Sequence, residues 1–153
     1  MGAVLLAGDL VQAEGKADLT VILNEEKTMQ FNNSQAIYLQ IADYICEKIL
    51  LKEWKAEDRV PSVRELAVQL EVNPNTVMRT FEYLQQQEII YNQRGVGYFV
   101  APSAFKNTVA LRKEAFMERD LPAVFRNLHL LGMNIEELAP RFEKFIKQNF
   151  SNN

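Results

Sequence analysis

Cysteine, histidine and long apolar segments are scarce in this chain. Its 153 residues include one cysteine, Cys46, and one histidine, His129. A lone cysteine excludes an internal disulfide framework and is typical of a reducing compartment. It also leaves no cluster of cysteine and histidine at the spacing that binds a metal. We therefore expect a cytoplasmic protein without a metal site or a cofactor.

The sequence also lacks the features of a membrane or secreted protein. No apolar run approaches the roughly 20 residues that a membrane-spanning helix requires. The N-terminus has no basic segment followed by an apolar core, which a secretory signal would need. We therefore expect no membrane partner.

Residues arranged for catalysis are missing as well. His129 belongs to an amphipathic segment, where a surface or interface role is far more common than acid–base chemistry. Gly95 and Gly97 follow a predicted strand but do not open a helix, so they do not form a dinucleotide-binding loop. We expect that the protein is not an enzyme and has no catalytic residues.

Basic residues do not dominate, because 17 Lys and Arg stand against 20 Asp and Glu and the formal net charge is −3. The acidity is uneven. Residues 1–35 hold 2 basic and 5 acidic side chains, residues 36–102 hold 7 and 9, and residues 103–153 hold 8 and 6. Phosphate contacts require Lys and Arg. Any binding to nucleic acid must therefore come from the placement of a few basic residues and not from bulk charge.

Residues 1–34 differ from the rest of the chain and are interpreted as an N-terminal extension. Residues 1–28 show no sustained helical period and only short apolar patches. Two interpretations stay open: the segment precedes a natural start at Met29, or it is a poorly ordered or strand-forming arm. Without residues 1–28 the net charge is 0, because this segment holds 2 basic and 5 acidic side chains.

A strongly amphipathic helix is predicted over residues 35–52. Isoleucine recurs at every fourth residue from Ile37 to Ile49, so these side chains share one face. Ser34 precedes the helix and is the expected N-cap. The isoleucine face is the main candidate for a hydrophobic core.

Two shorter helices joined by a tight turn are predicted over residues 61–70 and from Asn73 to about Gln87. Ser62 and Glu65 have the spacing of a capping box, in which each side chain accepts a hydrogen bond from the other residue's backbone N–H. Asn73 is a suitable N-cap for the second of these helices. The apolar positions of both helices face inward, and the outer positions are Arg64, Gln69, Asn75, Thr76, Met78, Arg79 and Glu82.

Residues 88–101 contain two β-rich arms on either side of Gln93-Arg94-Gly95-Val96-Gly97. The glycines permit positive φ, so a β-hairpin is predicted. Two helices followed directly by a hairpin is the order of a winged helix-turn-helix. We assign residues 35–102 to this domain.

Residues 103–150 are predicted to form a short all-α tail. Helices are expected over 104–119, 122–131 and 135–149, with a kink or break at Asp120-Leu121-Pro122 because proline removes a backbone hydrogen bond. The tail is too small to bury its many Phe and Leu side chains alone, so it needs the first domain or a second copy of the chain. The expected fold class is mainly α with a small β-hairpin: a winged helix-turn-helix domain followed by a short all-α dimerisation tail.

Arg64, Arg79 and Arg94 fall on the outer edges of three consecutive elements, and each has two interpretations. As surface charges, the first two would pair with neighbours such as Glu71 or Glu82, and Arg94 would be a solvated turn residue. As a set, the three would face the phosphates or base edges of a duplex. Helix spacing alone favours plain packing, whereas the glycine-containing hairpin favours DNA binding.

The segment VPSVRELAVQLEVNPNTVMRTFEYLQQQEIIYNQRGVGYFVA resembles the winged helix-turn-helix of the GntR family of bacterial transcription regulators. The turn VNPNTVMR and the short helical tail are similar to the YtrA-type subfamily, whose members lack a large effector-binding domain and dimerise through that tail. Two departures are Val60 in place of Leu and Glu88-Ile89 in place of Gly-Leu. The family pattern is matched at Pro61, Ser62, Arg64, Leu66, Ala67, Thr76, Val77, Leu84, Gly95, Gly97, Phe99 and Val100.

The resemblance implies a sequence-specific transcription regulator, a repressor that binds a pseudo-palindromic double-stranded DNA operator as a homodimer. The alternative is a winged helix used for protein–protein contact without DNA binding. The sequence identifies no small-molecule effector. By resemblance, the DNA-binding residues are Ser62, Arg64, Asn75, Thr76, Arg79, Arg94, Gly95 and Gly97. The residues expected at the dimer interface are Phe116, Leu121, Val124, Phe125, Leu128, Leu131, Leu138, Phe142 and Phe145.

Overall fold

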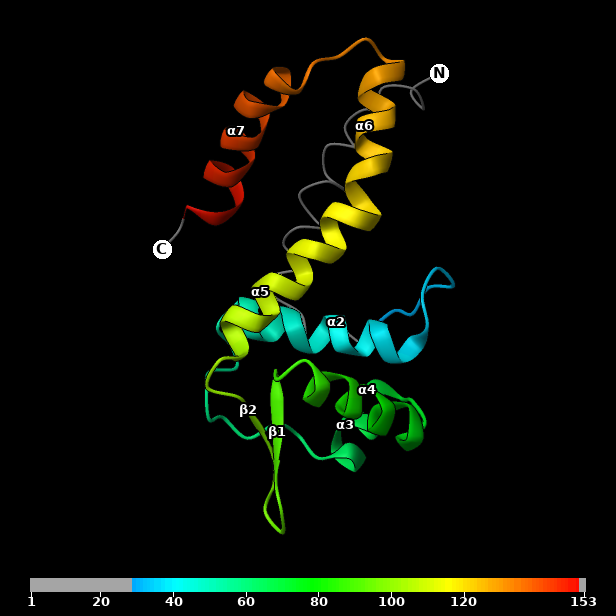
Figure 1. Ribbon diagram of the computed structural model, residues 1–153, viewed down its shortest axis with the longest axis vertical. Coiled ribbons are helices and arrows are strands. Elements are labelled where there is room, and N and C mark those ends of the chain that lie inside the picture. The colour runs from blue at the N-terminus through cyan, green and yellow to red at the C-terminus, as the bar shows by residue number, and fades with distance from the viewer. Residues whose placement is uncertain (1–28, 152–153) are drawn as a thin grey trace, which may run out of the picture. The chain divides into compact units, whose positions relative to one another are not determined.

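The computed structural model describes residues 29–151 of the chain (Figure 1). These residues divide into two compact units, residues 29–126 and residues 127–151. The expectations for residues 1–28 lie outside the described residues.

The element order agrees with the predicted fold class, which is mainly α with one antiparallel hairpin. A π-helical turn, η1, and a 3₁₀ turn, η2, lie among the C-terminal helices. The elements are α2 (Ile37–Leu50), α3 (Val63–Leu70), α4 (Pro74–Gln86), β1 (Ile90–Gln93), β2 (Gly97–Val100), α5 (Ala104–Ala115), η1 (Phe116–Asp120), α6 (Leu121–Leu130), η2 (Ile135–Leu138) and α7 (Ala139–Phe150).

Helix α2 begins differently from the prediction. Ser34 is not its N-cap, because α2 starts after Ala36 and the Ser34 hydroxyl donates to the side chain of Asn32 instead. The buried side chain of Gln40 holds this end of the helix. Its amide accepts from the Asn32 N–H at 3.0 Å and donates to the carbonyls of Asn32 and Gln35, each at 2.7 Å. A side chain within the helix therefore forms hydrogen bonds with the backbone N–H and carbonyl groups that precede the helix.

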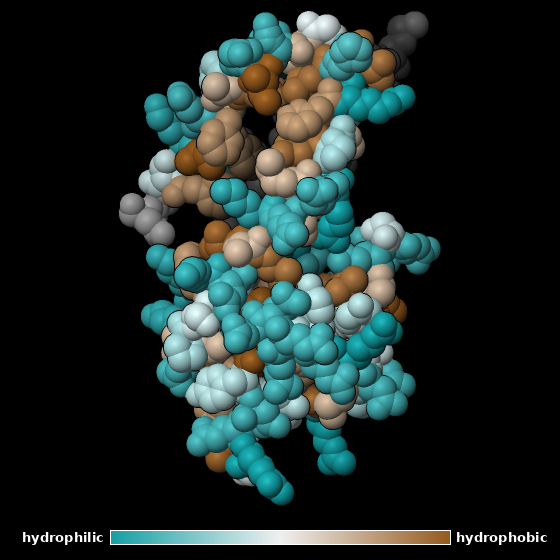
Figure 2. Space-filling view, viewed as in Figure 1, coloured by the Kyte–Doolittle hydropathy of each residue, from teal (hydrophilic) through white to brown (hydrophobic). Residues whose placement is uncertain are grey.

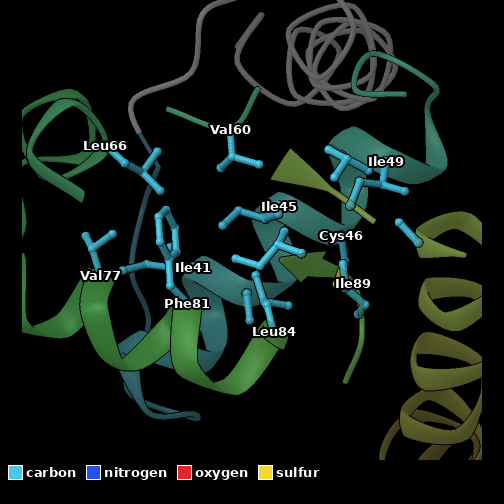
Figure 3. Packing of buried hydrophobic residues seen from close by; sticks show 14 of the residues in the cluster. Ile41, Ile45, Cys46, Ile49, Val60, Leu66, Val77, Phe81, Leu84 and Ile89 are labelled. Carbon is cyan, nitrogen blue, oxygen red and sulfur yellow. The ribbon is translucent and has the colours of Figure 1, made fainter. Parts of the chain in front are cut away.

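The core of the first unit forms around the isoleucine face of α2. Ile41, Ile45 and Ile49 are buried there, whereas Ile37 at the start of the helix is exposed. Helices α3 and α4 and the hairpin close over this face, as Figure 3 shows. The predicted apolar faces of α2, α3 and α4 therefore meet in one shared core, to which the hairpin and the segment before α3 also contribute. The remaining core residues are Val60, Leu66, Ala67, Leu70, Val77, Phe81, Leu84, Ile89, Ile90 and Val100.

A third segment, residues 58–60, pairs with the hairpin, and the sequence did not predict this pairing. Strands β1 and β2 pair in the register Ile90 with Val100 and Gln93 with Gly97. Arg59 forms a β-bridge with Phe99 on the free edge of β2. Hydrogen bonds of 2.9 Å from the Val60 N–H to Tyr98 and from the Val100 N–H to Asp58 fix this contact. The segment 58–60 therefore ties the start of α3 to the wing.

Of the two outcomes predicted for residues 120–122, a kink or a break, the break is wrong. The chain continues from α5 through the π turn Phe116–Asp120 into α6, with Pro122 in the first turn of α6. In that turn the Leu121 N–H bonds to the Phe116 carbonyl, five residues back. A π turn changes the register of the hydrogen bonds just before the proline, so the helix runs on without interruption.

The second unit contains the end of α6, the 3₁₀ turn and α7. Gly132, at φ +63°, follows α6, and the Met133 N–H bonds to the Leu128 carbonyl at 2.9 Å. The Glu137 carboxylate accepts from the Asn134 N–H at 2.9 Å. The single helix predicted for 135–149 is thus a 3₁₀ turn followed by α7, whose first turn contains Pro140. The missing N–H of a proline fits the first turn of a new α-helix, which explains the change there.

Candidate nucleic-acid interface

Helix α3 is fixed at its N-terminus by the predicted capping box. The Ser62 hydroxyl accepts from the Glu65 N–H at 3.2 Å, and the Glu65 carboxylate accepts from the Ser62 N–H at 2.7 Å. The bond that the Ser62 N–H donates to the Glu65 carboxylate is the main cause that holds the pKa of Glu65 below its ordinary value, and the Ser62 side chain lowers it further. Leu66, Ala67 and Leu70 pack inward, so the exposed Arg64 points away from the core.

Helix α4 has its own cap. The Asn73 side chain accepts from the Asn75 N–H at 2.8 Å, and Pro74 occupies the first turn. Asn75 is exposed and Thr76 half-buried, and this helix has no acidic residue in its first turn. With no carboxylate in its first turn, the N-terminus of α4 keeps its positive partial charge for an anion such as a phosphate.

Arg79, farther along α4, is exposed, and its guanidinium contacts an aromatic ring. Its guanidinium carbon lies 4.0 Å from the centre of the Tyr38 ring on α2. The next residue, Thr80, is buried and donates from its hydroxyl to the Tyr38 carbonyl at 2.9 Å. Arg79 therefore lies on the outer face of α4, as predicted, and it also contacts Tyr38 of α2, which was not predicted.

The wing places Arg94 and two glycines at the loop between the strands. Gly95 has φ +79° and Gly97 has φ +140°, conformations that side chains with a Cβ rarely adopt. The loop is closed by a hydrogen bond of 2.9 Å from the Val96 N–H to the Gln93 carbonyl. Arg94 is exposed in this loop. Figure 2 shows a mainly hydrophilic surface in this part of the first unit.

Arg59 is a basic residue of this region that the sequence analysis missed. A Cβ built on Gly97 would lie 3.6 Å and 3.7 Å from the Nε and Nη2 atoms of Arg59. The guanidinium of the exposed Arg59 therefore lies beside Gly97, at the loop end of the wing. In the sequence, Arg59 stands two residues before Pro61, just ahead of the helix-turn-helix. Its place beside the hairpin depends on the bridge to Phe99, which was not predicted.

The alternative of surface ion pairs for Arg64 and Arg79 is not realised. The ion pairs within residues 29–151 are Lys48 with Glu53 and Arg112 with Asp43. Neither Glu71 nor Glu82 takes part in one of these pairs. The guanidinium groups of α3 and α4 thus remain available to an external anion.

The apolar residues expected at a dimer interface are largely uncovered. In α6, η2 and α7, and in the π turn, no described residue is buried. Leu121, Leu128 and Leu138 are half-buried. The others are exposed: Phe116, Val124, Phe125, Leu131, Phe142 and Phe145.

Within residues 29–151, no three side chains of His, Cys, Asp or Glu come together as a metal site would require. None of the helices in this range combines the length and apolar character needed to cross a bilayer.

Comparison with known proteins identifies the family. Residues 37–100 match the family profile described as "Bacterial regulatory proteins, gntR family". The chain is 37% identical to the HTH-type transcriptional regulator YhcF of Bacillus subtilis over 76% of its own length and 94% of that protein. It is 34% identical to the HTH-type transcriptional repressor YtrA of the same organism, over 69% of the chain and 81% of that protein.

A solved structure supports the same assignment. A transcriptional regulator of the GntR family from Bacteroides thetaiotaomicron superimposes with a TM-score of 0.62 and 51% identity, covering 74% of this chain and 98% of that one. The match thus includes more than the helix-turn-helix segment. The chain belongs to the GntR family of bacterial transcription regulators, with a winged-helix DNA-binding domain.

Proposed function

We propose that this protein is a homodimeric repressor that binds a pseudo-palindromic DNA operator in the bacterial cytoplasm. The observation that carries the proposal is the exposure, on α3, α4 and the wing, of Arg64, Arg79 and Arg94, none of which is engaged by the ion pairs of residues 29–151. The relative named as a repressor, YtrA, supports the direction of regulation. Occupation of a promoter would block transcription.

In this proposal the parts of the domain have different roles. Asn75, Thr76 and Arg79 of α4 enter or flank the major groove, and Arg64 of α3 contacts the duplex beside them. The wing, with Arg94 between β1 and the two glycines, reaches the minor groove or the adjacent backbone. Ser62 caps α3 and adds a phosphate contact.

Two copies of the domain are needed for a pseudo-palindrome. In a homodimer the two α4 helices would lie about 34 Å apart, or a multiple of that distance, to enter successive major grooves of one face. We assign the dimer contact to the exposed apolar residues of the tail, of which Phe142 and Phe145 lie one turn apart on α7. Pairing of such faces in a second copy would remove them from water.

The DNA-binding proposal is tested in two steps. Genomic fragments that the purified protein retains are sequenced to define the operator, and the operator is then titrated against wild type and Arg79→Ala. We expect a loss of about 1–3 kcal/mol of specific binding free energy if Arg79 reads a base. Arg141→Ala, an exposed arginine of α7, is the matched control and should bind as wild type does.

Salt dependence separates the proposal from a protein-binding winged helix. A DNA reader releases counterions, so its affinity should fall steeply as salt rises. A protein that retains little duplex even at low salt would contradict the regulator proposal. Wild-type affinity of Arg79→Ala would remove only Arg79 from the reading surface.

The dimer proposal is tested by sedimentation at micromolar protein concentration. Wild type should sediment as a dimer, and Phe142→Glu combined with Phe145→Glu should sediment as a monomer. Glu143→Lys changes the charge of the same helix outside the apolar positions and should leave the dimer intact. A wild-type monomer at this concentration would refute the dimer.

A further inference from the structure

Three residues of helix α4 meet one residue of helix α2, Tyr38. The Arg79 guanidinium lies over its ring, with 4.0 Å from the guanidinium carbon to the ring centre. The ring of Tyr83 meets it edge to face, with centroids 6.2 Å apart and an interplanar angle of 81°. The Thr80 hydroxyl donates to the Tyr38 carbonyl at 2.9 Å. Tyr38 is therefore held on both its backbone and its ring, and its ring in turn holds Arg79.

This contact restricts a side chain that would otherwise be mobile. An arginine side chain has many rotamers, and this freedom is lost when the side chain binds a partner in one geometry. Within residues 29–151 the Arg79 guanidinium makes no hydrogen bond or ion pair, so its contact with the ring leaves its N–H groups to other acceptors. The Tyr38 ring thus orders Arg79 before any ligand arrives and leaves its hydrogen-bond donors available.

We propose that Tyr38 is a positioning residue for DNA recognition: its ring fixes the Arg79 guanidinium in a geometry that can read a base. This inference rests on the proposed function, because it requires that α4 enters the major groove. Tyr38 itself does not contact the base. It acts through Arg79, and the Thr80 hydrogen bond keeps the two helices in the register that this contact needs.

The test uses two substitutions of Tyr38 in the full chain. Tyr38→Leu removes the ring, whereas Tyr38→Phe keeps it and loses only a hydroxyl for which the structure shows no hydrogen bond within residues 29–151. For Tyr38→Leu we expect operator affinity to fall about two- to fivefold, the equivalent of an exposed cation–π contact. Affinity for non-specific duplex should stay unchanged, and Tyr38→Phe should bind the operator as wild type does.

The same substitution in an Arg79→Ala background separates positioning from packing. If Tyr38 acts through Arg79, Tyr38→Leu has no further effect on operator affinity once Arg79 is gone. An equal loss in both backgrounds would show that Tyr38 acts by packing α2 against α4, and would overturn the proposal. An unchanged or increased affinity of Tyr38→Leu with intact Arg79 would overturn it too, since the ring would then be idle or would withhold Arg79 from DNA.

Failure of the wider proposal has a different signature. Wild-type protein that retains no duplex at low salt refutes DNA recognition as a whole. Wild-type protein that binds the operator, with a Tyr38→Leu variant that binds equally well, refutes only the role of Tyr38. Thermal unfolding of each variant shows that the compared proteins are folded at the temperature of the titration.

Discussion

Replacing Ser62 by alanine tests how helix α3 is held and what this means for Arg64. Ser62→Ala removes the acceptor for the Glu65 N–H, a 3.2 Å bond, and leaves the first turn of an eight-residue helix without its side-chain cap. The loss of an N-cap hydroxyl costs about 1 kcal/mol. For a domain of this size, that corresponds to a fall in melting temperature of about 4–8 °C.

The matched controls come from the same chain. Ser62→Asn keeps a side chain that caps as well as serine and should restore the melting temperature. Ser103→Ala changes the serine before α5, whose hydroxyl caps no backbone N–H and accepts an exposed bond of 3.2 Å from the Asn107 side chain, and should cost less. Thermal and urea unfolding of the three variants measure the differences. Equal losses for Ser62→Ala and Ser103→Ala would refute the assigned role of the cap.

The cap also has a consequence for DNA binding and for pH. Arg64 lies in the first turn of α3, so Ser62→Ala should weaken operator binding both through fraying of that turn and through loss of the proposed Ser62 phosphate contact, and Ser62→Asn, which restores the cap, should weaken it less. The lowered pKa of Glu65 means that its carboxylate stabilises the fold above its ordinary pKa of 4.5, and that this contribution is lost as the pH falls through the lowered value. Glu65→Gln should flatten that part of the pH–stability curve.

Two other predictions concern the core. Phe81 is fully buried, and the centre of its ring lies 4.7 Å from that of Tyr98 of β2. Phe81→Ala should therefore lower the free energy of unfolding in urea by about 3–5 kcal/mol, whereas Val68→Ala, at a side chain 79% exposed, should change it by close to nothing. Similar losses for the two variants would contradict the packing. Burial raises the pKa of Cys46 to about 11, so iodoacetamide at pH 8 should label this thiol only after denaturation. Rapid iodoacetamide labelling of the native protein would refute the burial of this thiol. Because the pKa of Cys46 in the folded state lies above the ordinary 9.0, the thiol should also destabilise the fold as the pH rises above 9.0.

The elements that the sequence predicts well are those that depend on near neighbours. The capping box of α3 and the N-cap of α4 act over two or three residues, and the isoleucine period of α2 acts over four. The glycines of the wing require positive φ at known positions of a tight loop. Each of these signals is complete within one short segment, so the segment alone is enough to identify it.

The features that the sequence does not predict depend on partners far along the chain. The segment 58–60 is too short and too charged to be identified as a strand, and only β2, about 40 residues away, pairs with it. The start of α2 depends on the reach of the Gln40 side chain to Asn32, which outweighs the local preference for a serine cap. The π turn before Pro122 depends on how a helix adjusts its hydrogen bonds, which composition does not show.

The candidate site divides in the same way. The positions of Arg64, Arg79 and Arg94 on three outer edges follow from helix period and hairpin order. The neighbours of these residues do not follow: Arg59 reaches the wing only through the β-bridge, and Tyr38 reaches Arg79 only through the packing of α2 on α4. A sequence pattern thus predicts which side chains face outward, whereas tertiary contacts decide how firmly they are held.

Helix α7 has a property that bears directly on the assembly. It has 12 residues, near the length below which an isolated helix is marginal in water, and none of its residues is buried in the described chain. Its apolar side chains Phe142, Phe145 and Ile146 recur at helical spacing, so they form one face. Packing of such a face, and not intrinsic propensity, supplies most of the stability of a helix. If a second copy covers this face, as we propose, the helicity of α7 and the dimer should form together and should be lost together on dilution.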